Sequence, residues 1–246
     1  GNRQNLIVNG SIAFNAASSP LSSFSESYLG ELPVNALERS NDEVAKTLSA
    51  STDASYLVKI SEGRSILKVS GKAAFTGGGS ETRFSNSTEY FNPYSINESS
   101  QFYNLNSLNQ TYSAGVNFTH KISRLSFIDF SLGTGYSSES IERRQGDLSG
   151  GMLPINELSP DFIKQERYIR PGIGWKRSTV RSQLRLSLLA PTGMYGTTLN
   201  GAGREDAKYF FITPRASWEY EYRSGRRFTL GYSSSIVTPR ATQLLP

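Results

Sequence analysis

Hydrophobic and polar residues alternate along the stretch from Tyr209 to Tyr222. One side of the alternation carries Phe210, Ile212, Pro214, Ala216, Trp218, Tyr220 and Tyr222, and the other carries Phe211, Thr213, Arg215, Ser217, Glu219 and Glu221. A repeat of two residues places alternate side chains on opposite faces of a strand. Arg223-Ser224-Gly225-Arg226 is a tight-turn signal, and a second alternating run follows from Phe228 to Ile236. The pattern predicts a β-hairpin with one apolar, aromatic face and one charged face.

The same alternation recurs in earlier runs, which we expect to be strands. They cover Leu6–Ala16, Leu21–Leu29, Val44–Ile60, Leu67–Phe75, Thr111–His120, Leu125–Tyr136, Lys164–Trp175 and Val180–Leu189. Ser18-Ser19-Pro20 predicts a turn, and Gly30–Glu43 predicts an irregular segment compatible with a short helix.

The connections between these runs alternate in length. Short turns are expected near Glu62, Ser123, Ser178 and Ser224, and long polar loops over residues 76–110, 137–163 and 191–207 and after Val237. Outer-membrane barrels have short periplasmic turns and long extracellular loops. We therefore expect an all-β fold: an antiparallel, up-and-down wall of a transmembrane β-barrel, with about ten strands long enough to cross the hydrocarbon.

A soluble sheet with its apolar face on a core is the competing interpretation of the alternation. The aromatic residues favour a membrane, because they gather near the short turn, where amphipathic rings would meet the bilayer interface. The expected interface aromatics are Tyr56, Phe118, Phe127, Trp175, Trp218, Tyr220, Tyr222 and Phe228.

The composition bears on the choice between a soluble sheet and a transmembrane barrel. The chain has 246 residues, a net charge of +5, 37% hydrophobic residues and a mean hydropathy of −0.41. No apolar run is long enough for a transmembrane helix, which leaves barrel strands as the expected spanning element. The absence of cysteine excludes a disulfide scaffold and a thiolate metal site. The sequence has no cluster of Lys and Arg of the kind that would indicate nucleic-acid binding. No signal-peptide pattern opens the chain, so we expect it to start within a longer or processed polypeptide.

The sequence offers no catalytic site, cofactor site or metal site, so we expect that the chain is not an enzyme. His120 is the one histidine, and no nucleophile-elbow motif accompanies it. We interpret it as a polar residue at the membrane interface.

Charged residues gather on the polar side of the alternation, where the interior of a barrel is expected. The expected interior charges are Lys68, Lys72, Arg181, Arg185, Arg215, Glu219 and Arg227, with Asp53, Lys59, Asp129, Arg170 and Glu221 on the same side. They form either a weakly cationic wall that guides anionic solutes or a set of cross-strand pairs and contacts to a plug.

Three stretches carry a resemblance to a known family. They are TYSAGVNFTHKISRLSFIDFSLGTGY (111–136), FFITPRASWEYEY (210–222) and LGYSSSIVTPRATQLLP (230–246). Together they resemble the barrel region of TonB-dependent receptors, in particular their outer-membrane β-barrel family. The resemblance implies a barrel of about 22 strands with a plug domain in its lumen, energy coupling from the periplasm, and a multi-pass location in the Gram-negative outer membrane.

Residues 1–246 are therefore expected to form part of an outer-membrane β-barrel domain, without a plug-like or energy-coupling stretch before Leu6. The implied function is binding and uptake of a large or scarce ligand by the long loops. Outer-membrane lipid, a plug domain or partner proteins, and an energy-coupling protein are the expected partners. A barrel that does not transport and serves as an accessory subunit of an outer-membrane complex is the main alternative, and a barrel enzyme or adhesin is a third.

Overall fold

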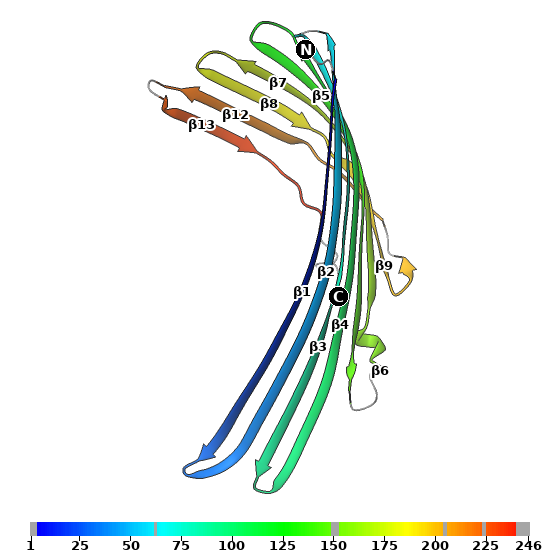
Figure 1. Ribbon diagram of the computed structural model, residues 1–246, viewed down its shortest axis with the longest axis vertical. Coiled ribbons are helices and arrows are strands. Elements are labelled where there is room, and N and C mark those ends of the chain that lie inside the picture. Colours follow the sequence, from blue (N-terminus) through cyan, green and yellow to red (C-terminus); the bar gives the residue numbers. More distant parts are fainter. Residues whose placement is uncertain (1–3, 62, 149–152, 204–205, 223–224, 240–246) are drawn as a thin grey trace.

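The chain forms one open, strongly curved antiparallel β-sheet (Figure 1). The computed structural model describes residues 4–61, 63–148, 153–203, 206–222 and 225–239. Along the sheet the main order is β1-β2-β3-β4-β5-β7-β8-β12-β13. Strands that pair along this path therefore follow one another in the chain, apart from the short strands that the path skips. Four further strands lie off this path, with β6 on β5, β9 on β7, and β10 and β11 on β9.

Six of the strands, β1 to β5 and β7, are 18 to 30 residues long. The strands are β1 (Gln4–Leu29), β2 (Leu32–Ser61), β3 (Ser65–Phe91), β4 (Tyr94–Lys121), β5 (Ser126–Asp147), β6 (Leu153–Pro154), β7 (Asp161–Ser178), β8 (Ser182–Leu189), β9 (Thr192–Leu199), β10 (Ala202–Gly203), β11 (Ala207–Phe210), β12 (Thr213–Glu221) and β13 (Arg227–Ser233). A single 3-10 turn, η1 (Asn156–Leu158), is the helical element of the described residues. The expected all-β, antiparallel, up-and-down architecture is therefore confirmed.

The sheet is open in the described part of the chain, because no pairing there joins β1 to β13. β1 is the first edge strand and is exposed along its whole length of 26 residues. β13 is the other end of the main path. A closed barrel consequently stays a prediction.

The register confirms the alternation expected from the sequence. Leu132 of β5 lies opposite Val116 of β4 on one side and Pro171 of β7 on the other. Val116 in turn lies opposite Val69 of β3, which lies opposite Tyr56 of β2. The apolar positions of separate runs thus fall on one face of the sheet, as period-two alternation requires.

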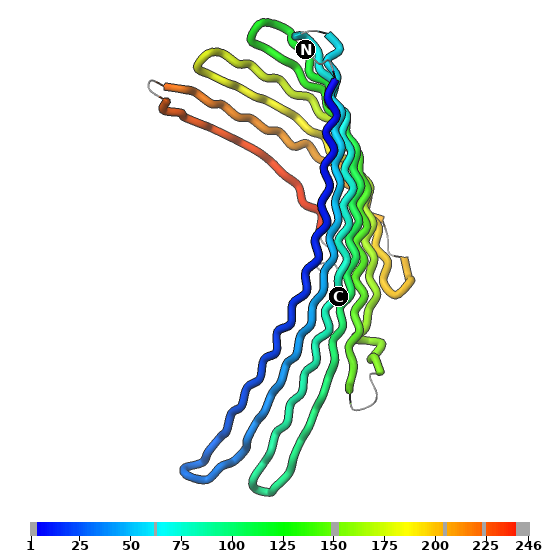
Figure 2. Tube along the Cα trace, in the orientation of Figure 1, coloured from blue at the N-terminus to red at the C-terminus, as the bar shows by residue number. Residues whose placement is uncertain are grey.

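The strands extend far beyond the alternating runs. The turn expected at Ser18-Ser19-Pro20 is wrong, because these residues pair with Val44, Glu43 and Asp42 within the β1–β2 ladder. Most of the segment expected to be irregular, residues 30–43, belongs to β2. Figure 2 shows the traces of the first four strands continuing without interruption to their hairpin tips.

The expected loops over residues 76–110, 137–163 and 191–207 contain paired strands as well. Residues 191–207 include β9 and β10, with β9 pairing with β7 and with β10. Residues 76–110 form the outer parts of β3 and β4, which pair up to Phe91 and Tyr94, and residues 137–147 continue β5. These parts are mainly polar, with scattered apolar residues such as Phe84, Phe102 and Ile141, so the sequence lacks the regular apolar alternation that marks a half-buried strand. Backbone hydrogen bonds to neighbouring strands, which do not depend on side-chain pattern, hold them extended.

The short turns lie together at the opposite end of the sheet. Gly63 takes a positive φ of 68°, and the N–H of Arg64 donates to the carbonyl of Ser61 at 3.1 Å. The turn expected at residues 176–179 lies later, since β7 runs to Ser178. There Ser182 N donates to Thr179 Oγ1 at 2.9 Å, which closes a side-chain turn.

Candidate functional site: the two faces of the sheet

One face of the sheet carries a continuous strip of apolar side chains, here called the apolar band. It consists of the alternate, outward residues in Leu6–Phe14 (β1), Leu48–Val58 (β2), Leu67–Phe75 (β3), Tyr112–Phe118 (β4), Ile128–Tyr136 (β5), Ile169–Trp175 (β7), Leu184–Leu188 (β8), Pro214–Tyr220 (β12) and Phe228–Tyr232 (β13). On β1, β2, β3 and β5 the band covers about the 9–11 residues that a tilted strand needs to cross hydrocarbon, and on the other strands it is shorter.

No layer of the described structure covers this band. Ile12 is 81% exposed, Leu132 52% and Leu230 60%. The buried hydrophobic residues of the described chain are few, and their one cluster, Ile141 with Phe162, lies outside the band. A contiguous exposed apolar surface of this kind indicates contact with another apolar phase or protein. In the described segments we find no helix with the length and apolar character needed to span a membrane.

Aromatic residues line the short-turn end of the band. The Trp218 ring lies 6.0 Å from Tyr220 and makes an edge contact with Phe228 at 5.8 Å. Trp175 lies opposite Ile128 and Leu186, Phe118 opposite Phe130, and Tyr56 opposite Val69. Tyr222 follows directly after β12, where its N–H donates to the carbonyl of Arg226.

Phe127 does not share this face. It lies opposite Lys121 of β4 and Lys176 of β7, both on the polar side. Its neighbour Ile128 belongs to the apolar band, and successive side chains of a strand point to opposite faces. The register therefore places Phe127 on the polar face, away from the other expected interface aromatics.

The polar face brings together most of the charged residues singled out from the sequence. Lys72 lies opposite Asp53, Arg227 lies opposite Glu221, and Arg185 lies opposite Lys176. The same face carries Lys68 opposite Asn117, Arg215 opposite Ser187, and Glu219 opposite Gln183. Arg181 lies in the turn before β8, outside the strands. Both opposite charges and like charges lie across from each other on neighbouring strands. The charged face is therefore compatible with guidance of anionic solutes and with structural pairing of charges.

A second polar cluster was not found from the sequence. After β13 the chain leaves the sheet, and residues 234–239 cross its polar face, here called the C-terminal strap (Figure 1). Thr238 Oγ1 donates to Glu166 Oε2 at 2.8 Å, and Lys164 Nζ donates to the carbonyl of Pro239 at 2.6 Å. Tyr209 OH donates to Glu166 Oε1 at 2.8 Å. Three segments that are far apart in the chain, β7, β11 and the strap, therefore meet at the Glu166 carboxylate.

The centre of this cluster is nearly shielded from solvent. Lys164 and Glu166 form an ion pair of 3.4 Å with side chains that are 7% and 13% exposed. The Lys164 ammonium also lies 5.5 Å from the centre of the Tyr195 ring. Tyr209 is on the polar face, next to the end of the apolar band nearer the long hairpins. Burial, followed by its hydrogen bond to Glu166, raises its pKa. No local sequence pattern indicates this cluster, because Lys164 and Thr238 are separated by 74 residues.

Two tyrosines of the polar face lie over glycines of neighbouring strands. A Cβ added at Gly135 would lie 2.5 Å from the Tyr168 ring, and one at Gly193 would lie 2.5 Å from Tyr209 OH. The Arg170 guanidinium lies 5.0 Å from the centre of the Tyr168 ring. Glycine at these positions allows the rings to lie flat along the sheet.

His120 lies at the short-turn end of β4. Its Nδ1 is 2.9 Å from Ser65 Oγ, and its ring stacks on Phe118 with centroids 6.2 Å apart. In the described ranges no group of three or more His, Cys, Asp and Glu side chains is placed to hold a metal ion.

These features define a class: a single-layer, antiparallel β-sheet with an exposed apolar band on one face and a charged face opposite. Comparison of the chain with protein-family models and with curated proteins finds no match.

Proposed function

We propose that this chain forms part of the wall of an outer-membrane β-barrel whose apolar band faces lipid and whose polar face lines the lumen. The single observation that carries the proposal is the alignment of exposed apolar residues, strand after strand, into one strip. Such a strip exposed to water is energetically unfavourable, at about 25 cal/mol for each Å² of apolar surface. A strip of this width is what hydrocarbon favours.

The arrangement of connections supports the same proposal. The short turns after β2, β4, β7 and β12 lie at one end of the sheet, and the long hairpins β1–β2 and β3–β4 extend from the other (Figure 1). In barrels of this type the long hairpins face the cell exterior. Closure needs further strands against β1 and β13, because unpaired backbone groups in lipid cost several kcal/mol each.

We further propose that the barrel is of TonB-dependent receptor type and takes up a large or scarce ligand. The outer halves of β1 to β4 provide an extended, polar surface for capture of that ligand, and the polar face provides its path. Lys68, Lys72, Arg185 and Arg215 would favour an anionic ligand on that path.

Tryptophan fluorescence tests the membrane assignment directly. The chain has two tryptophans, Trp175 and Trp218, and both lie on the apolar band. In the full-length protein reconstituted into bilayers, with any tryptophans outside this chain replaced, we expect brominated lipid tails to quench both. Emission insensitive to brominated lipids but quenched by aqueous iodide would overturn the assignment.

Uptake is tested separately in cells. Loss of the energy-coupling protein should abolish accumulation of the ligand if the barrel is a transporter. An unchanged phenotype, together with stoichiometric co-purification of other outer-membrane proteins, would instead support the accessory-subunit alternative.

A further inference from the structure

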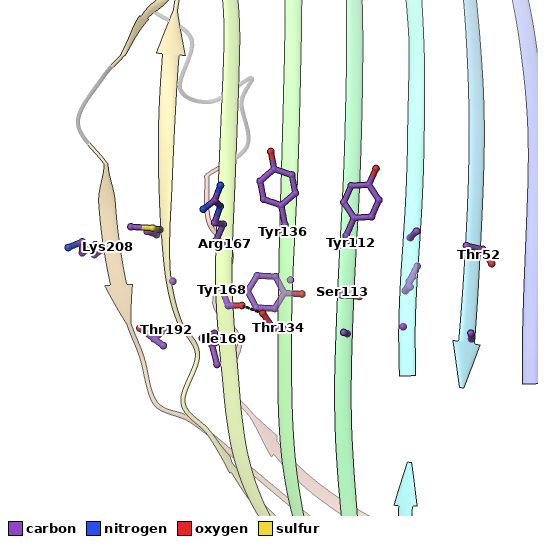
Figure 3. A pocket seen from close by; sticks show the side chains of 18 residues that line it. Thr52, Tyr112, Ser113, Thr134, Tyr136, Arg167, Tyr168, Ile169, Thr192 and Lys208 are labelled. Carbon is purple, nitrogen blue, oxygen red and sulfur yellow. Dashed lines mark hydrogen bonds between the residues drawn. The ribbon is translucent and has the colours of Figure 1, made fainter. Parts of the chain in front are cut away.

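The apolar band is hollowed at its long-hairpin rim. A shallow depression of about 940 Å³ opens there across β2 to β5, β7, β9 and β11 (Figure 3). Its floor is made of small residues of the band, among them Ala54, Gly71, Ala73 and Ala114. Small side chains between larger neighbours leave room for a flexible apolar chain to lie against the sheet.

Two cations border this hollow on the side away from the short turns. Arg167 of β7 and Lys208 of β11 both lie opposite Met194 of β9, so they are on the same face and two strands apart. Figure 3 shows Lys208, Arg167, Tyr136 and Tyr112 in one line across the strands, at the upper border of the hollow. The apolar band ends at the row of Ile169 and Thr192. The two cations lie in the next row of the same face toward the long hairpins.

The two tyrosines complete the border. Tyr112 and Tyr136 stack with ring centroids 6.4 Å apart, and the Arg167 guanidinium lies 5.8 Å from the centre of the Tyr136 ring. Among the described residues, neither Arg167 nor Lys208 has a carboxylate partner, and both side chains are exposed. Cations placed beside aromatic rings at the edge of an apolar surface match the boundary between lipid headgroups and tails.

We infer that this hollow binds a phosphorylated lipid, with the phosphate held by Arg167 and Lys208 and an acyl chain lying over Ala54, Gly71 and Ala114. The inference rests on the proposed function, because it requires the apolar band to face a bilayer. Guanidinium and ammonium groups donate charge-assisted hydrogen bonds to phosphate oxygens. The hydroxyls of Tyr112 and Tyr136 lie at the same border and can add hydrogen bonds to the headgroup.

One acidic residue opposes this charge. Asp206 lies two residues before Lys208, and its carboxylate lies against Gly196. Gly196 is the next residue after Met194 on the same face of β9, toward the long hairpins. Its carboxylate lowers the local positive potential, so its removal should strengthen phosphate binding. This gives a variant that moves affinity in the opposite direction from loss of the cations.

The test is a titration of the full-length protein in neutral detergent micelles, with bound lipid counted by native mass spectrometry. Phosphatidic acid is the probe, and phosphatidylcholine with the same acyl chains is the neutral comparison. We expect preference for phosphatidic acid, and we expect Arg167→Gln with Lys208→Gln to weaken its binding by about tenfold or more. Arg167→Lys should retain most of the affinity, and Asp206→Asn should increase it.

Lys68→Gln is the matched control, since Lys68 is an exposed cation on the polar face and does not line the hollow. It should leave phosphatidic acid binding unchanged. Equal binding by the double variant and the wild-type protein, or an equal loss in Lys68→Gln, would overturn the inference. Binding of inorganic phosphate with no preference between the lipids would overturn it too, because the site would then be one for a free anion.

The outcome separates this inference from the proposed function. If brominated lipids fail to quench Trp175 and Trp218, the membrane assignment itself is wrong. If quenching is intact in wild type and in the double variant while lipid preference is absent, only the lipid site is wrong. Retained quenching also shows that the double variant has folded.

Discussion

Lys164 and Glu166 form a 3.4 Å ion pair on the polar face of β7 that water hardly reaches. The pair links the strap to the sheet, because Lys164 donates to the carbonyl of Pro239 and Glu166 accepts from Thr238. Removal of one partner of a buried pair leaves the other charge uncompensated, which is more costly than the pair is stabilising.

We therefore expect Glu166→Gln to lower the free energy of unfolding by about 3 kcal/mol. Urea unfolding in detergent micelles measures this change. Glu98→Gln is the control, since Glu98 is an exposed carboxylate on the outer part of β4, and its effect should stay within about 0.5 kcal/mol. Equal stability of the two variants would contradict the linkage of the strap through Glu166.

Val116 and Asn117 are neighbours on β4 that point to opposite faces, and they give a direct comparison of those faces near the middle of the band. Val116→Lys places a charge in the apolar band and should destabilise the bilayer-embedded protein by about 2–4 kcal/mol. Asn117→Lys adds the same side chain to the polar face, where a change of less than about 1 kcal/mol is expected. Unfolding titrations in lipid vesicles measure both, and similar costs would argue against a lipid-facing band.

The tyrosines over Gly135 and Gly193 give a third test. Gly193→Ala would bring a methyl group to 2.5 Å from Tyr209 OH and 2.6 Å from the Arg167 carbonyl oxygen, so the ring that holds Glu166 and the β7–β9 ladder must both shift. We expect a loss of about 1–3 kcal/mol in unfolding free energy. Gly231→Ala is the matched control, because Gly231 is a strand glycine with no atom within 4 Å of an added Cβ.

Tyr209 also predicts a dependence of stability on pH. Burial and the Glu166 hydrogen bond raise the pKa of Tyr209 in the folded protein, whereas an unfolded tyrosine ionises near pH ~10. The stabilisation is then complete below pH ~10 and is lost as the pH rises toward the folded-state pKa. The difference in unfolding free energy between wild type and Tyr209→Phe should be constant from pH 7 to 9 and decrease by pH 11; a constant difference throughout would contradict the prediction.

A fifth prediction concerns the long hairpins. Phe84 lies opposite Gln101, so removal of residues 84–101 and insertion of a two-residue turn takes away matched halves of β3 and β4. The remaining register keeps its faces, and we expect normal assembly in the membrane with loss of ligand binding at the cell surface. Flow cytometry with a labelled ligand, alongside heat-modified migration of the barrel on gels, separates binding from assembly.

The sequence predicted the apolar band well because each band strand obeys the same constraint. Outward positions such as Leu132 and Val116 are apolar and inward positions such as Ser131 and Asn117 are polar, which is the period-two alternation expected of a strand whose two faces meet different surroundings. The pairing of Leu132 with Val116 then follows from that alternation and from the short turn at residues 122–125.

The outer parts of the strands lack this constraint. Around Asn86 and Ser99, which pair with each other, both faces are exposed and polar, so Asn and Ser occur where a loop is equally consistent with the sequence. Their extended conformation comes from hydrogen bonding to neighbouring strands, which is non-local. For the same reason, the meeting of Lys164, Glu166 and Tyr209 with Thr238 depends on the path of residues 234–239 and left no local pattern.

The paired outer halves of β3 and β4 have a mechanical consequence. Residues 76–91 of β3 are held by ladders to both β2 and β4, and about 16 extended residues span roughly 50 Å along the strand. If the sheet closes into the proposed barrel, hairpins braced in this way would resist folding over its mouth, unlike an unpaired loop. Closure of the proposed lumen would then depend on unpaired peptide such as residues 234–239, which polar contacts to Lys164, Glu166 and Pro214 hold in place.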